Sequence, residues 1–279
     1  MHRDLDRLLE TGVANYMEVL DSFRQFMEPL AAISRDGTTM SHPCWVNRLL
    51  IGLDTVALYG FTRTRRPHRY VEIGSGQSTK VVARARRDGS LTTHITSIDP
   101  APRRSVDALC DVSIRSHLEL VDVDATFGPL VEGDIVFFDG SHRVLPNSDC
   151  VAFFLDVLPS LPPGVLVGVH DIYLPADYPA GFLEMWWSEQ YLLAAMLLAD
   201  CPWLEITLPA FYASGRDDLA AVLGELWSRP NLRGVNPRGS SFWMTTKDHG
   251  VATRTASRRP PPVASRPPSA SPYGAPDDD

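Results

Sequence analysis

A strand, a glycine turn and a helix are predicted in direct succession between residues 69 and 89. The stretch 70–73 reads as a buried strand, and Gly74 and Gly76 follow it immediately. The helix after the turn ends at Gly89, which suits a left-handed helix end. Because glycine lets the backbone approach a bound molecule without a Cβ atom in the way, this order of elements predicts a ligand cradle.

The spacing of the glycines bears on the kind of ligand. A dinucleotide-binding fingerprint has glycines at its first, third and sixth positions. Counted from Gly74, the sixth position here is Thr79, and an acidic residue, Glu72, precedes the turn. The spacing counts against a nicotinamide-dependent enzyme without excluding one, and an ordinary strand-to-helix turn also stays open.

Apolar runs after the cradle predict the rest of a sheet. Continuous apolar runs are typical of parallel strands that are buried on both faces, and helices between them complete βαβ units. We therefore expect an α/β fold, a doubly wound and mostly parallel seven-stranded sheet. The six further strands are predicted at residues 94–99, 112–115, 134–139, 164–169, 203–212 and 240–246.

Helical patterns precede and separate these strands. An apolar stripe at helical spacing predicts helices at residues 4–20 and 45–59, so residues 1–65 form an N-terminal helical extension. The stripe at residues 181–200 predicts another helix, with Trp186 and Trp187 in the core. Further helices are expected at residues 149–157 and 217–227.

The end of the chain differs in composition. Residues 66–248 are expected to form the folded domain, whereas residues 249–279 are rich in Pro and Ser. A segment of this kind buries too little apolar surface to offset the entropy of ordering it. We therefore expect a disordered tail.

Composition limits the partners and the compartment. The chain has 279 residues, and its 26 Lys and Arg against 34 Asp and Glu give a net charge of −8, which argues against a nucleic-acid partner. Its four cysteines are far apart, which favours reduced thiols. The longest apolar run, 191–199, is too short for a membrane span, and the N-terminus lacks a signal-peptide pattern. We expect a cytoplasmic protein without a membrane partner.

The string Val-Glu-Ile-Gly-Ser-Gly at residues 71–76 resembles motif I of class I S-adenosylmethionine-dependent methyltransferases. The resemblance extends over residues 68–246 and implies S-adenosylmethionine as the cofactor, with its methionine part over the glycine turn. Asp99 ends the second strand about two dozen residues after the turn, where a carboxylate can accept both ribose hydroxyls; capping the turn before Pro100 is its alternative role. The predicted cofactor-binding residues are Glu72, Gly74, Ser75, Gly76, Ser78, Asp99 and Asp139.

Polar residues follow the fourth and fifth predicted strands: Asp139, His142, His170 and Asp171. In open α/β sheets ligands bind at such strand ends. The layout resembles the catechol-type, metal-dependent and the macrocin-type O-methyltransferases. The resemblance implies Asp139, His170 and Asp171 as ligands of a divalent metal. Histidine would favour Mn²⁺, Fe²⁺ or Zn²⁺ over Mg²⁺. A hydrogen-bonded network without metal is the alternative.

The same resemblance places His142 where the catechol type has its lysine base. The predicted catalytic residues are His142 as general base, His170 as the second candidate, and Asp139. A histidine has a reference pKa of about 6.5, which suits proton removal near neutrality. We therefore predict an O-methyltransferase that acts on a hydroxyl group of a small molecule of sugar or natural-product type. A nicotinamide-dependent oxidoreductase, a non-catalytic cofactor-binding protein and a homodimer stay open.

Overall fold

The sheet has seven strands in the order β3-β2-β1-β4-β5-β7-β6 in the computed structural model, which describes residues 1–37, 41–102 and 106–248. All neighbouring strands are parallel except β7, which is antiparallel to both β5 and β6. This confirms the predicted fold; the predicted tail, 249–279, lies outside the described residues. The strands are β1 Arg69–Ile73, β2 His94–Ile98, β3 Val112–Ile114, β4 Ile135–Phe138, β5 Leu166–Val169, β6 Leu204–Pro209 and β7 Phe242–Thr246.

The centre of the sheet is buried on both faces. Every residue of β4 and β5 is buried, as expected for apolar parallel strands. Gly168 of β5 lies between Phe137 and Trp243 on the neighbouring strands. A Cβ atom there would lie 2.6 Å from the Trp243 ring and 2.8 Å from the Phe137 ring. The glycine therefore makes room for these two aromatic rings in the core.

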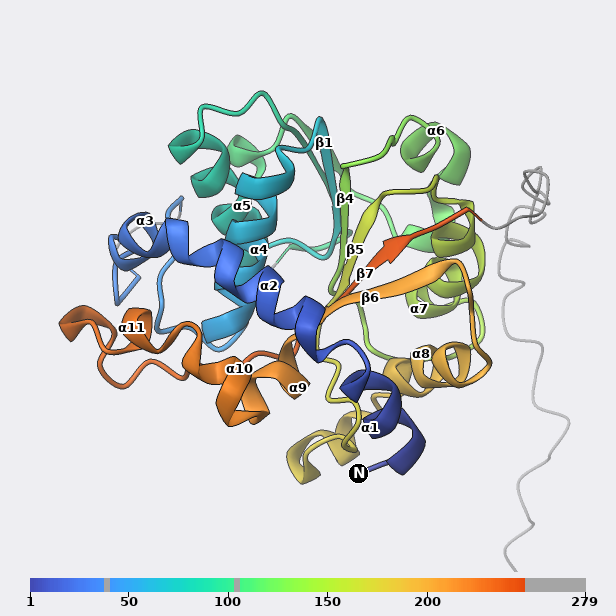
Figure 1. Ribbon diagram of the computed structural model, residues 1–279. Helices are drawn as coiled ribbons and strands as arrows, with labels where there is room; N and C mark the ends of the chain where they lie inside the picture. Colours follow the sequence, from blue (N-terminus) through green and yellow to red (C-terminus); the bar gives the residue numbers. More distant parts are fainter. Residues whose placement is uncertain (38–40, 103–105, 249–279) are drawn as a thin grey trace, which may run out of the picture.

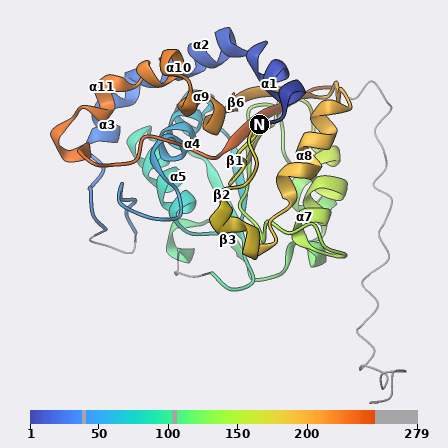
Figure 2. The same cartoon turned by 90° about the horizontal axis from the view of Figure 1, so that it is seen from below.

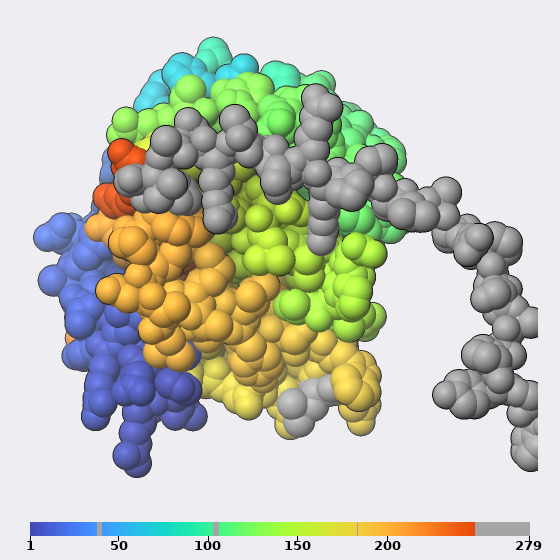
Figure 3. All heavy atoms as spheres, turned by 90° about the vertical axis from the view of Figure 1, so that its right-hand side faces the viewer, coloured from blue at the N-terminus to red at the C-terminus, as the bar shows by residue number. Residues whose placement is uncertain are grey.

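Helices cover both faces of the sheet (Figures 1 and 2). Helices α4 (Gly52–Arg65) and α5 (Gln77–Asp88) lie side by side on one face. The other face carries α6 (Val123–Phe127), α7 (Asp149–Ala152) with the π-helical segment η4 (Phe153–Val157), and α8 (Glu189–Leu198). Figure 3 looks onto this second side, where the yellow-green and gold-orange segments adjoin one another. The short 3₁₀ segments are η1 Arg24–Phe26, η2 Asp107–Leu109, η3 Leu118–Leu120, η5 Leu158–Ser160, η6 Ala180–Met185 and η7 Pro230–Leu232.

The N-terminal residues form two helices where one was predicted at 4–20. Helix α1 (Arg3–Glu10) ends before Gly12, and α2 (Val13–Phe23) begins after it. A Cβ atom at Gly12 would collide with the Tyr16 ring, so the bend depends on this glycine. Helix α2 packs against α4 and β6, while α1 touches α8 and α3 (Met27–Ala31) follows η1.

The helix predicted at residues 45–59 starts later than expected, at Gly52. Residues 45–51 instead form a turn around Asn47. Its side-chain amide donates to the carbonyls of Cys44 and Leu50, and its oxygen accepts from the N–H groups of Leu49 and Leu50. These side-chain bonds replace the backbone bonds of a helix.

The apolar stripe at residues 181–200 is interrupted before α8 begins. Trp186 has a left-handed backbone (φ 59°) and is 78% exposed, so its predicted place in the core is wrong. Trp187 is half-buried. Near the C-terminus, β6 gives way to α9 (Ala210–Gly215), and two short helices follow, α10 Asp217–Ala221 and α11 Gly224–Trp227.

The four cysteines, Cys44, Cys110, Cys150 and Cys201, are free thiols. In the described part of the chain, no helix combines the length and the apolar character that crossing a membrane requires.

Candidate active site

The glycine turn after β1 lies directly against the end of β4. Gly74 has φ 82°, a conformation that suits glycine, and a Cβ atom there would collide with the carbonyl oxygen of Asp139. A Cβ atom at Gly76 would meet nothing within 4 Å. The turn is therefore closed on the side of Asp139 and open above Gly76, as a cradle for a ligand requires.

Glu72 supports the turn from inside the protein. Its side chain is fully buried and accepts hydrogen bonds from the hydroxyls of Tyr70 (3.0 Å), Ser78 (2.9 Å) and Thr79. The Thr79 hydroxyl also accepts from the N–H of Gly76 (3.0 Å). Burial raises the pKa of Glu72 to about 7, against the lowering effect of these bonds. The structure gives Glu72 and Ser78 a supporting role; direct contact with a cofactor stays a prediction for both.

Asp99 connects the end of β2 to the glycine turn. One carboxylate oxygen accepts from the N–H (2.9 Å) and the hydroxyl (3.0 Å) of Ser75, and the other accepts from the N–H of Ala101 (2.8 Å). The capping role considered from the sequence is thus present. Since a carboxylate has about four acceptor positions and Asp99 is half-buried, acceptor capacity remains for a ligand.

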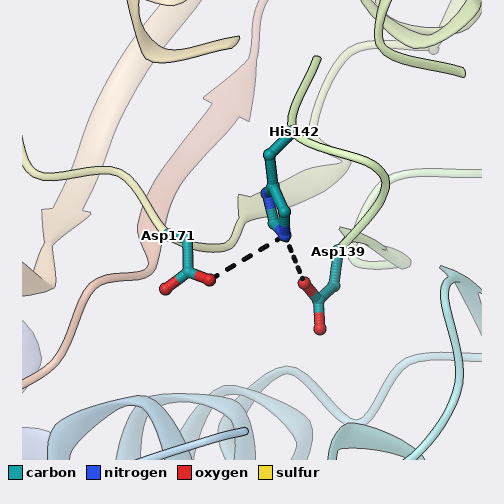
Figure 4. A group of neighbouring side chains, drawn as sticks. All are labelled: Asp139, His142 and Asp171. Carbon is teal, nitrogen blue, oxygen red and sulfur yellow. Dashed lines mark ion pairs between the residues drawn. The ribbon is translucent and has the colours of Figure 1, made fainter. Parts of the chain in front are cut away.

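Three of the predicted residues meet at the ends of β4 and β5. The Nε2 atom of His142 lies 3.5 Å from Asp139 Oδ1 and 3.8 Å from Asp171 Oδ2, with its ring between the two carboxylates (Figure 4). His142 (φ 61°) and Asp171 (φ 56°) both have a left-handed backbone. Such strained conformations in residues other than glycine gather at functional sites.

His170 also lies close to these two carboxylates. Its Nδ1 atom lies 3.4 Å from Asp139 Oδ1 and 3.5 Å from Asp171 Oδ2, and its Nε2 atom lies 3.6 Å from Asp54. The side chain is buried, and neither ring nitrogen has a hydrogen-bond partner among the described residues. Burial lowers the pKa of His170, but Asp171 and Asp139 outweigh it and hold the pKa well above its usual value.

Asp171 is anchored by residues that the sequence did not indicate. Its Oδ1 atom accepts from the hydroxyls of Ser240 (2.9 Å) and Tyr173 (3.4 Å), which leaves Oδ2 facing the two histidines. Asp54, buried on α4, accepts from the N–H groups of Ser240 and Ser241. An acidic residue near the start of a helix whose first half is mainly apolar was the one available signal for Asp54.

Glu189, the first residue of α8, was also missed. Its Oε1 atom lies 2.5 Å from Nδ1 of His142. Burial lowers the pKa of His142, but Glu189, followed by Asp139 and Asp171, raises it overall to about 9. The expectation that this histidine titrates near neutrality is therefore wrong, because it lies among three carboxylates.

Aromatic rings enclose the side of the site next to α8. The Trp187 ring lies 4.1 Å from the His142 ring between centroids, and Phe182 stacks on Trp187 at 4.4 Å. Tyr173 contacts Phe182 and Phe211. These four aromatic residues are half-buried, so partly exposed apolar surface lies beside the polar cluster.

Residues 71–172 match a family model described as a methyltransferase domain. The matched segment runs from β1 to just beyond β5 and contains the glycine turn, Asp99 and the cluster at the ends of β4 and β5. Residues 71–172 are therefore similar to a methyltransferase domain, in agreement with the resemblance of residues 71–76 to motif I. The match favours a methyltransferase over the nicotinamide-dependent alternative. No curated protein gives a significant match.

Structural comparison matches the chain to several solved methyltransferases. The methyltransferase PaMTH1 of Podospora anserina, bound to S-adenosylhomocysteine, is 16% identical, with 70% of this chain and 79% of that chain covered and a TM-score of 0.43. An O-methyltransferase from Bacillus cereus is 12% identical over 83% of this chain and 91% of that chain (TM-score 0.43). The O-methyltransferase TomG from Streptomyces achromogenes is 15% identical over 84% and 89% (TM-score 0.42).

The methyltransferase domain carries donor atoms that fit a divalent metal. Asp139, His142 and Asp171 each offer one ligand atom, and these atoms lie within 4.8 Å of one another. The Nδ1 atom of His170 lies 3.4 and 3.5 Å from the same two carboxylates. The sequence predicted His170 as a ligand and His142 only as a base, whereas the geometry adds His142 to the donor set. Mixed nitrogen and oxygen donors suit Mn²⁺, Fe²⁺ or Zn²⁺.

Proposed function

We propose that this methyltransferase transfers the methyl group of S-adenosylmethionine to a hydroxyl group of a small molecule of sugar or natural-product type. The observation that carries the proposal is the position of His142 Nε2 between Asp139 and Asp171, next to a glycine turn that touches Asp139. Methyl donor and acceptor hydroxyl would then meet at the ends of β4 and β5.

The reaction needs alignment and the removal of one proton. The acceptor oxygen forms a bond to the methyl carbon as the bond from that carbon to sulfur breaks, and the hydroxyl proton passes to His142 Nε2. Holding two reactants in line contributes up to about 7–11 kcal/mol to such a step. Gly74, Gly76 and Asp99 would hold the cofactor, while Asp171 and the rings of Tyr173 and Trp187 would hold the acceptor.

His142 is the proposed base because Nε2 points into the cluster while Nδ1 is occupied by Glu189. With a pKa of about 9, its neutral form becomes populated as the pH rises towards that value. In the alternative mechanism, Asp139, His142 and Asp171 would hold a divalent cation that supplies Lewis-acid polarisation of the acceptor hydroxyl, and His142 Nε2 would then be a metal ligand instead of the base. His170 remains the second candidate base, although it is more deeply buried.

Methyl transfer to a panel of hydroxylated acceptors tests this proposal directly. We expect S-adenosylhomocysteine to form with at least one phenolic, sugar or polyketide-type acceptor. His142→Ala should lower kcat by roughly 10²–10⁴-fold with little change in cofactor affinity. His94→Ala, an exposed histidine at the start of β2, is the matched control.

Full activity of His142→Ala would remove His142 as the base and transfer that role to His170. Cofactor binding without turnover on any acceptor would instead favour the non-catalytic alternative. Cytoplasmic location and a homodimer remain predictions from the sequence.

A further inference from the structure

The N-terminus of α8 contacts His142 through both side chain and backbone. Glu189 is fully buried, and its Oε1 atom lies 2.5 Å from His142 Nδ1. Its second oxygen accepts from the thiol of Cys150 at 3.7 Å. Burial raises the pKa of Glu189, while the interaction with His142 lowers it. A buried carboxyl group is costly unless it is paired, so His142 is the partner that this glutamate requires.

The backbone contacts come from the same turn of α8. The N–H groups of Ser188 and Glu189 donate to the carbonyl oxygen of His142 at 2.8 and 3.4 Å. The Ser188 hydroxyl accepts from the N–H of Val144 at 2.9 Å, and the Arg143 guanidinium donates to the carbonyl of Met185 at 2.8 Å. Together these bonds hold the loop after β4 in the conformation that gives His142 its left-handed φ of 61°.

The position of Glu189 fixes which ring nitrogen carries the proton. In a neutral imidazole one nitrogen donates and the other accepts. A carboxylate at Nδ1 accepts from Nδ1–H, so the lone pair is left on Nε2. That atom is the one facing Asp139 Oδ1 and Asp171 Oδ2. Within the described part of the chain, Glu189 is the only residue that hydrogen-bonds to a ring nitrogen of His142.

We propose that Glu189 is a positioning residue of the active site, which holds the His142 ring by Nδ1 and directs the lone pair of Nε2 towards the reacting hydroxyl. The inference rests on the proposed function of His142. It applies equally whether Nε2 removes a proton or binds a metal, because both roles need the lone pair on that atom. Trp187, whose ring lies 4.1 Å from the His142 ring at an interplanar angle of 37°, limits the motion of that ring but cannot select the protonated nitrogen.

Glu189→Gln tests the inference with a side chain of the same size. An amide can accept from Nδ1–H or donate to Nδ1, so it permits both tautomers. We expect kcat to fall by about 10–100-fold, as for other residues that orient an active-site histidine, with the affinity for S-adenosylhomocysteine within about twofold of wild type. Glu189→Asp, whose carboxylate is one methylene shorter, should recover less than half of the lost activity.

Cys150→Ala is the matched control. It removes the other contact of Glu189 and disturbs the same buried packing, but it leaves the carboxylate at Nδ1. Its kcat should stay within about threefold of wild type. Equal losses of kcat in Cys150→Ala and Glu189→Gln would mean that packing alone is responsible and would overturn the inference.

The nitrogen signals of His142 provide a readout that does not depend on turnover. In protein labelled with ¹⁵N-histidine, with His142→Asn used for assignment, the neutral ring should carry its proton on Nδ1. In Glu189→Gln a substantial fraction should carry it on Nε2. Unchanged ring signals together with unchanged kcat would overturn the inference, even if His142→Ala is inactive. Absence of methyl transfer in wild type would instead overturn the proposed function, and the ring signals would still test the role of Glu189.

Discussion

Asp99 and Ser75 join two strand ends through a single carboxylate oxygen. That oxygen accepts from both the N–H and the hydroxyl of Ser75, at 2.9 and 3.0 Å. The glycine turn and the end of β2 therefore form one rigid edge. Since both segments are expected to contact the cofactor, the position of the ribose and that of the methionine part are set together.

Asp99→Ala should weaken binding of S-adenosylhomocysteine by about tenfold or more, because hydrogen bonds to a charged acceptor contribute about 1.5–3 kcal/mol each. Isothermal titration measures the affinity. Asp111→Ala is the control, since that carboxylate accepts from the N–H of Ile95 near the other end of β2. Equal affinities for wild type and Asp99→Ala would remove Asp99 from the cofactor site.

Glu72→Gln should change how stability depends on pH. Burial raises the pKa of Glu72 from 4.5 to about 7 in the folded protein. The folded state therefore holds a proton that the unfolded state releases, and the stabilisation present below pH 4.5 is lost as the pH rises through 7. The unfolding free energy of wild type relative to Glu72→Gln should fall by roughly 3 kcal/mol over this range. Urea denaturation at several pH values measures the difference; parallel curves would contradict it.

Gly168→Ala should destabilise the sheet centre by about 1–3 kcal/mol, because its methyl group would press on the Trp243 and Phe137 rings. Gly215→Ala at the end of α9 is the control, as nothing lies within 4 Å of a Cβ atom there. Equal unfolding midpoints for the two variants would show that the rings move aside.

Removal of divalent cations by a chelator tests whether turnover depends on a metal. If Asp139, His142 and Asp171 hold a divalent cation, a chelator should abolish turnover, and Mn²⁺ or Fe²⁺ should restore it better than Mg²⁺. Asp171→Asn should weaken Mn²⁺ binding, measured by titration, whereas Asp124→Asn on the exposed face of α6 should not. Undiminished turnover in metal-free protein, with His142→Ala inactive, would select proton removal without a metal.

Truncation after Asp248 should leave the thermal midpoint and the cofactor affinity unchanged. Residues 249–279 are rich in Pro and Ser, a composition that contributes little to a packed core. Thermal denaturation and titration of both chains provide the comparison. A large loss of either quantity would show that this segment binds to the domain.

The sheet could be predicted because its strands are encoded locally. The apolar runs in β4 and β5, each ended by a polar residue, indicate buried parallel strands and their order along the chain. Helix boundaries depended on single side chains that a periodic pattern does not reveal. Asn47 replaces the expected helix start with a turn, and Gly12 divides the first helix in two.

Within the site, only the residues at or just after the ends of strands could be predicted from the sequence. Asp139 comes directly after β4 and Asp171 comes two residues after the end of β5, so their meeting follows from the sheet topology. Glu189 lies 47 positions from His142, and Asp54 lies 186 positions from Ser240. Nothing local marks such partners, and the rise in the pKa of His142 depends first on Glu189.

The contact between Gly74 and Asp139 bears on how the two proposed substrates affect each other's affinity. The carbonyl of Asp139 fills the space beside the glycine turn, and its carboxylate faces the two histidines. In the proposed arrangement, Asp139 would therefore lie between the methyl donor and the acceptor. We therefore expect that a shift of Asp139 on binding of one substrate changes the affinity of the protein for the other.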